Sequence, residues 1–145
     1  GGFPVERGTA DRAALRACQD VLERGEPMVM FPEGTRQYGP VVEADLMHAG
    51  PAFVAARAGV PIIPMGIAGT DYAMPGGSMF IRPVRVVMVV GEPIRPPVVD
   101  GRIPRRMVDE LTERLRVGLQ ECFDEAQRLA GRPALPAPGV EPSGD

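Results

Sequence analysis

A carboxylate and a guanidinium lie three residues apart in the hexapeptide Phe31-Pro32-Glu33-Gly34-Thr35-Arg36. Phe31, the first residue of the hexapeptide, is also the last residue of the apolar run 28–31. A short apolar run before a Pro/Gly turn is typical of a buried strand that ends in a loop. In open α/β sheets, ligands gather at the carboxyl ends of strands. We therefore expect Glu33 and Arg36 to face a crevice at the end of this strand.

The chemistry that these residues support is the recognition of a phosphate group. A guanidinium can give a phosphate two parallel charge-assisted hydrogen bonds. Thr35 and the backbone amide of Gly34 can add donors, while Glu33 can orient Arg36 or bond a hydroxyl of the ligand. The competing interpretation is an ion pair between Glu33 and Arg36 that only fixes the turn. The hexapeptide alone leaves both open.

Three sequence blocks occur in a fixed order, at Gly2–Arg7 (GFPVER), Phe31–Arg36 (FPEGTR) and Val60–Pro64 (VPIIP). They resemble the second, third and fourth motif blocks of the PlsC-type glycerophospholipid acyltransferases, a family that includes 1-acylglycerol-3-phosphate acyltransferase. The FPEGTR block is the specific signal, and the resemblance covers roughly residues 1 to 97.

The resemblance implies an α/β fold, with a mostly parallel sheet flanked by helices and its N-terminal part missing. It implies transfer of a fatty acyl group from acyl-CoA or acyl-carrier protein to the hydroxyl of 1-acylglycerol-3-phosphate. Arg7 and Arg36 would then bind the acceptor phosphate, although Arg7 taken alone is an ordinary surface charge. Pro61 and Pro64 would lie near the acyl donor, or would simply fix the backbone.

The first block of the family, an HxxxxD pair whose histidine acts as general base, does not occur in this sequence. The single histidine is His48, which follows FPEGTR and has Phe53 five residues later. We assign no catalytic residue, and we expect the chain as given to show no turnover. We interpret residues 1–130 as the C-terminal part of one acyltransferase domain. His48 is then a core or helix-start histidine, with a weak phosphate or coenzyme contact as the alternative.

Two rival functions stay open. The acceptor can instead be glycerol-3-phosphate or another lysophospholipid, or the protein can bind a lipid phosphate or an acyl donor without catalysis. The resemblance implies the cytoplasmic face of the cell membrane, reached peripherally or through an anchor outside this chain. Residues 72–80, within a long Gly/Pro-rich connection, can contact acyl chains or a bilayer surface, or can pack on the core.

Composition excludes several other classes of protein. A net charge of −3 and only seven aromatic residues disfavour nucleic-acid binding. All 16 basic residues are arginine, which excludes a lysine Schiff base or a P-loop lysine. Asp71 and Glu92 are isolated acids, so no metal site is predicted, and no cofactor is expected beyond the acyl donor as co-substrate. Ser78 lacks a GxSxG motif. Cys18 and Cys122 are expected to be buried thiols.

Hydrophobic periodicity predicts alternating helices and strands. Helices are expected after Thr9 or Asp11 as far as Gly25, from Pro51 to Gly59, and from Pro104 to Gly131. Strands are expected at 28–31, 60–67 and 84–90, with Pro61 and Pro64 at strand ends, edges or bulges. This order favours a largely parallel sheet covered on both faces. Residues 131–145 are expected to be a disordered tail.

Overall fold

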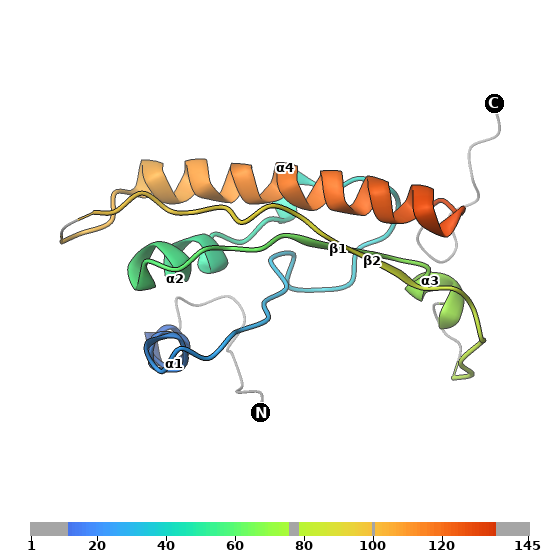
Figure 1. Ribbon diagram of the computed structural model, residues 1–145, viewed down its shortest axis with the longest axis horizontal. Coiled ribbons are helices and arrows are strands. Elements are labelled where there is room, and N and C mark those ends of the chain that lie inside the picture. Colours follow the sequence, from blue (N-terminus) through green and yellow to red (C-terminus); the bar gives the residue numbers. More distant parts are fainter. Residues whose placement is uncertain (1–11, 76–78, 100, 136–145) are drawn as a thin grey trace.

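The computed structural model describes residues 12–75, 79–99 and 101–135 (Figure 1). A long C-terminal helix extends along the molecule, and the shorter elements lie beneath it in Figure 1. The elements in chain order are α1 (Arg12–Glu23), the 3-10 helix η1 (Ala44–Leu46), α2 (Gly50–Ala58), β1 (Met65–Ala68), α3 (Thr70–Ala73), β2 (Val87–Val90) and α4 (Arg105–Ala130).

The three longer helices form where periodicity predicted them. Gly59 and Gly131 follow the last residues of α2 and α4 in the left-handed conformation, as expected of residues that end a helix. In α4, Met107, Leu111 and Leu115 recur every four residues and are all buried. The prediction of an amphipathic helix opened by Pro104 is confirmed.

The sheet differs from the expectation. β1 and β2 pair antiparallel, with Met65 opposite Val90 and Ala68 opposite Val87, whereas we expected a mostly parallel sheet. Among its described residues, the connection between the strands holds one helix, the four-residue α3. A parallel pair needs a crossover, usually a full helix, that carries the chain back to the same end of the sheet. Without one, the chain turns back beside itself.

The predicted strand at 28–31 is wrong. These residues have no regular secondary structure, and the side chains of Val29 and Phe31 are 78% and 79% exposed. A strand is held by backbone hydrogen bonds to a neighbour, and none of the described residues pairs with this run. An apolar pattern indicates which side chains favour burial, but it does not indicate whether a neighbouring strand is present to pair with the run.

Three glycines allow α4 to lie directly on the strands. A Cβ added to Gly66 would lie 2.4 Å from the backbone carbon of Cys122, and one on Gly91 would lie 2.6 Å from the Cys122 Sγ. A Cβ on Gly118 of α4 would lie 3.1 Å from the Pro64 ring. We call Gly66, Gly91 and Gly118 the glycine seam. Any larger side chain there would push the helix away from the sheet.

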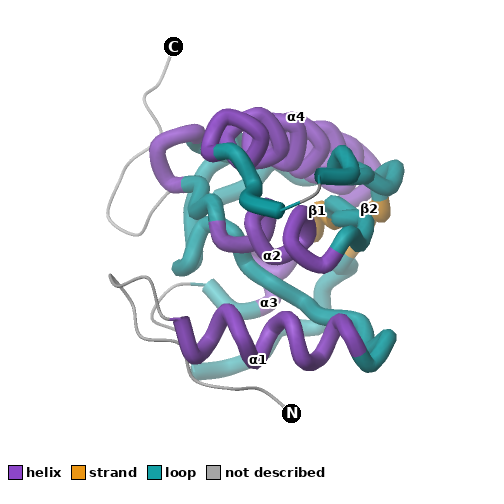
Figure 2. Tube along the Cα trace, turned by 90° about the vertical axis from the view of Figure 1, so that its left-hand side faces the viewer, coloured by secondary structure: helices purple, strands orange, loops and turns teal. Residues whose placement is uncertain are grey.

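Helices cover only one face of the strand pair among the described residues. Gly66 and Ala68 lie on the covered face, against α4. The alternate residues Met65 and Ile67, and Met88 and Val90 across from them, are exposed. α2 packs against α4, and α1 packs against α2 (Figure 2). The expectation of a sheet covered on both faces is therefore not met in this part of the chain.

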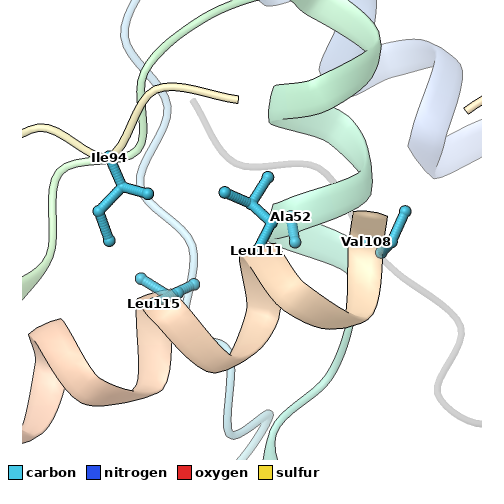
Figure 3. Packing of buried hydrophobic residues seen from close by; sticks show 5 residues of the cluster. All are labelled: Ala52, Ile94, Val108, Leu111 and Leu115. Carbon is cyan, nitrogen blue, oxygen red and sulfur yellow. The ribbon is translucent and has the colours of Figure 1, made fainter. Parts of the chain in front are cut away.

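The hydrophobic core lies between α4, α2 and the segment after β2. It is formed by Ala52, Ile94, Val108, Leu111 and Leu115 (Figure 3). Ile94 also pairs with Ile62 through two backbone hydrogen bonds of 2.7 and 2.9 Å, which extend the β1–β2 ladder. The prolines lie as predicted, at the start of the strand. Pro64 is fully buried, and its carbonyl accepts a hydrogen bond from the amide of Gly91.

Residues 132–135, expected to belong to the tail, instead contact α3. The Tyr72 hydroxyl donates to the Pro133 carbonyl at 2.9 Å, and the Leu135 amide donates to the Asp71 carboxylate at 2.7 Å. The Arg132 guanidinium stacks 5.2 Å from the centre of the Tyr72 ring. Residues 136–145 lie outside the described residues. No helix in the described ranges is both long and apolar enough to span a bilayer.

We predict that Gly66→Ala destabilises the fold by about 3 kcal/mol or more, because the new methyl meets helix backbone that cannot rotate away. Thermal or urea unfolding measures this loss. Gly50→Ala is the matched control, since a Cβ at Gly50 meets no atom within 4 Å. That variant should unfold at or slightly above the wild-type midpoint. Equal stability of both variants would contradict close packing of α4.

Candidate functional site

The FPEGTR hexapeptide forms a tight turn on the surface. The Gly34 amide donates to the Phe31 carbonyl at 3.0 Å, which closes a four-residue turn with Pro32 in its second position. Gly34 has a φ of 67°, in the left-handed region that glycine adopts without strain. The turn uses the Gly34 amide internally, so this group is not free to bind a ligand as the sequence suggested. The role of Gly34 is therefore to allow the backbone conformation that closes the turn.

His48 braces this turn from the segment before α2. Its backbone amide donates to the Pro32 carbonyl at 2.8 Å. A Cβ on Gly34 would lie 2.8 Å from the His48 Nε2, so the imidazole packs against the Gly34 backbone. From the sequence, His48 was expected to be a core or helix-start histidine, with a weak phosphate or coenzyme contact as the alternative. It is exposed rather than in the core, and it lies two residues before α2. The structure places it next to the predicted site, and only the requirement for glycine at position 34 could have indicated such a neighbour.

The chain that leaves the turn is held on α4. The Val42 amide donates to the Gln120 Oε1 at 2.8 Å, and the Gln120 Nε2 donates to the Pro40 carbonyl at 2.9 Å. The Arg116 guanidinium reaches the Val42 carbonyl at 3.4 Å, while two bonds of 2.7 and 2.9 Å to Glu113 fix its direction. These side chains satisfy backbone groups that lie outside any sheet. The turn is therefore positioned by α4.

Glu33 and Arg36 have different surroundings. Glu33 is half-buried, and this burial raises the pKa of its carboxyl. Arg36 and Thr35 are exposed. Within the described part of the chain no ion pair joins Glu33 to Arg36, so the interpretation of a purely structural pair is not supported. The Arg36 guanidinium is accessible to a ligand on the surface of a fixed turn.

The remaining predicted site residues lie apart from this turn or outside the described residues. Arg7 belongs to the residues outside the described ranges. Pro61 is exposed before the Ile62 bridge, and Pro64 packs on Gly118 of α4. Both cysteines are free and buried, as predicted, and burial raises the pKa of the Cys18 and Cys122 thiols. Among the described residues, no three His, Cys, Asp or Glu side chains gather as metal ligands.

A cleft of about 310 Å³ lies between η1 and α4, close to the braced turn. Met47 and Ala49, on either side of His48, line it together with Arg105, Asp109 and Arg116. Its lining holds two arginines and two acidic residues, and Arg116 is already paired with Glu113. The cleft contains none of the predicted site residues, so we place the candidate site at the turn.

We predict that Gly34→Ala destabilises the protein and that His48→Ala relieves part of this loss. The left-handed backbone conformation would destabilise an alanine at this position by about 1–2 kcal/mol, and the alanine methyl would also contact the imidazole. A double-mutant cycle of unfolding free energies separates these terms. The double variant should be more stable than the sum of the two single changes. Simple additivity would show that the His48 imidazole does not contact residue 34.

We predict that Glu33→Gln stabilises the fold at neutral pH. Because burial raises the folded-state pKa, the protonated carboxyl is favoured by folding, and this stability is lost as pH rises through the folded pKa. The glutamine side chain of the variant does not ionise, so the variant keeps its stability as the pH rises. Unfolding midpoints of variant and wild type should differ most at pH 7 and converge as the pH falls below the usual range of glutamate. A variant that is less stable at pH 7 would show that the carboxylate has a stabilising partner.

Comparison with known proteins gives a consistent family. The sequence profile of the Acyltransferase family matches residues 1–68. The chain is 37% identical over 83 residues to a 1-acyl-sn-glycerol-3-phosphate acyltransferase of Chlamydomonas reinhardtii, which covers 57% of the chain and 24% of that relative. It is 35% identical over 68 residues to the chloroplastic acyltransferase BAT2 of Brassica napus, covering 44% of the chain and 18% of the relative. The chain thus spans about a quarter or less of these relatives.

The fold gives the same result. The crystal structure of the 1-acyl-sn-glycerophosphate acyltransferase PlsC from Thermotoga maritima superposes with a TM-score of 0.59 at 27% identity. The match covers 77% of this chain and 44% of that one. In sequence over residues 1–68 and in fold, the chain is therefore similar to the Acyltransferase family and to PlsC-type glycerophospholipid acyltransferases.

Proposed function

We propose that this chain carries the acceptor-binding part of a 1-acylglycerol-3-phosphate O-acyltransferase of phospholipid biosynthesis. The observation that supports it most directly is the exposed Arg36 guanidinium on a turn that His48 and α4 hold in place. The relatives and the solved structure that the chain resembles are named as acyltransferases of this substrate. The acyl donor would be acyl-CoA or acyl-carrier protein.

In this proposal the turn binds the phosphate of the acceptor. The Arg36 guanidinium would give the phosphate two parallel hydrogen bonds, and the exposed Thr35 hydroxyl would add a third. Glu33 lies beside them in a half-buried position, where a hydroxyl of the glycerol would be a suitable donor to its carboxylate. Arg7 would supply a second guanidinium, as the resemblance implies.

Binding and proton transfer would belong to different residues. Acyl transfer from a thioester to a hydroxyl needs a base for the hydroxyl and stabilisation of the developing oxyanion. The resemblance gives the base role to the histidine of an HxxxxD block, and His48 has Phe53 in place of the aspartate. We therefore propose that this chain alone binds the acceptor without turnover. The reaction needs no cofactor besides the acyl donor.

We also propose a wider sheet for the whole domain. Large α/β sheets often carry an antiparallel strand at the edge of otherwise parallel strands. β1 and β2 expose Met65, Ile67, Met88 and Val90 on one face, so further elements of a mostly parallel sheet and its helices would bury apolar surface there. The protein would work at the cytoplasmic face of the cell membrane, where its lipid acceptor resides.

We predict that Arg36→Ala in the full-length enzyme raises the acceptor KM about 10- to 100-fold and leaves the donor KM nearly unchanged. This range corresponds to the loss of charge-assisted hydrogen bonds of about 1.5–3 kcal/mol. Steady-state assays of thiol release, with each substrate varied in turn, measure both constants.

Arg36→Lys should recover only part of the affinity, because an ammonium lacks the planar fork. Arg106→Ala removes another exposed arginine, whose partner Glu110 lies on the same helix, and it should leave both constants unchanged. If Arg36→Ala affects both KM values equally, the guanidinium does not bind the acceptor.

A further inference from the structure

The connection between α3 and β2 forms a loop with a fixed base. The Arg82 amide donates to the Ala73 carbonyl at 2.8 Å, which joins the two ends of the loop. At the base of β2, a Cβ added to Gly69 would lie 2.4 Å from the Arg85 carbonyl, so these backbones are also in close contact. Met79, Phe80 and Ile81 directly precede this base, at the end of the molecule where α3 lies (Figure 1).

Three consecutive large apolar side chains project from this loop. Met79, Phe80 and Ile81 are 92%, 82% and 79% exposed. Single exposed apolar residues are ordinary, but a contiguous group of this size marks a surface for another molecule. We call Met79, Phe80 and Ile81 the apolar tip.

The charged residues next to the apolar tip in sequence are arginines. Arg82 and Arg85 follow it and are exposed, and the sequence from Ala73 to Gly91 contains no aspartate or glutamate. This local excess stands out in a chain with a net charge of −3. Apolar side chains beside exposed arginines match the boundary between acyl chains and anionic headgroups, where the apolar groups insert and the guanidiniums bind phosphates.

We propose that the apolar tip, with Arg82 and Arg85, docks the protein on an anionic lipid surface. This inference rests on the proposed function, since a lysophospholipid acceptor would reach the turn from such a surface. A second copy of the chain is the less favoured occupant. In a symmetric pair of tips, Arg82 and Arg85 of the two copies would repel each other.

The absence of tryptophan from the sequence provides a direct test. In Phe80→Trp, the only indole of the chain lies in the apolar tip. On addition of phosphatidylcholine vesicles with 30% phosphatidylglycerol, roughly an anionic leaflet, its emission should shift to the blue, and brominated lipids should quench it. Val98→Trp is the matched control, because Val98 is 97% exposed but lies in the β2–α4 connection. It should respond to neither.

Three results would overturn the proposal. Phe80→Trp can fail to respond to the vesicles, Val98→Trp can respond equally, or the Phe80→Trp shift can appear without lipid as protein concentration rises. The last result would indicate self-association. Circular dichroism of each variant confirms that the helices are retained.

The arginines give a second, independent measurement. Arg82→Gln with Arg85→Gln should weaken vesicle binding about 20- to 30-fold, since each arginine near an anionic surface contributes about 1 kcal/mol. Arg57→Gln with Arg106→Gln makes the same change of charge elsewhere and should have a much smaller effect. Equal losses would show attraction by net charge alone and would overturn the docking site.

Both measurements use vesicles without lysophosphatidate, so they are separate from the test of Arg36. Normal vesicle binding together with an unchanged acceptor KM in Arg36→Ala would contradict the proposed function alone. Lost vesicle docking together with a raised acceptor KM would contradict this inference alone.

Discussion

The close contact of α4 with the two strands is the constraint on which the rest of the structure depends. The glycine seam leaves no side chain at three positions where α4 and the strands approach closely, and Pro64 and Cys122 pack against these glycines. Packing at this density stabilises through many short contacts, none of which is large. It also fixes the direction of α4 relative to β1, because a helix seated on backbone has few alternative positions.

α4 connects this packing to the candidate site. Its apolar stripe contributes Val108, Leu111 and Leu115 to the core, while its polar face holds residues 40–42 through Gln120 and Arg116. One helix therefore both stabilises the fold and fixes the segment that leaves the FPEGTR turn. Glu33 is half-buried on this turn without an ion-pair partner among the described residues, which is unfavourable for stability and typical of a functional position.

The sequence predicted local structure well and pairing poorly. Helix boundaries follow from caps and periodicity, which are local, so α2 and α4 end at Gly59 and Gly131 as expected. The antiparallel direction of β2 and the absence of a strand at 28–31 depend on which distant segments pair in the folded chain. No local sequence pattern encodes this pairing. At the candidate site, Arg36 and Glu33 were predicted from their motif, but the contact of His48 with Gly34 joins residues whose proximity exists only in the folded chain.

The glycine seam brings together parts of the chain that the ribosome synthesises at different times. Gly66 meets Cys122, and at 5–20 residues per second a ribosome needs roughly 3 to 11 s to add the residues between them. During this interval β1 has no helix to cover it, and its apolar residues are open on both faces. The close packing on Gly66 can therefore form only after this part of α4 has been synthesised.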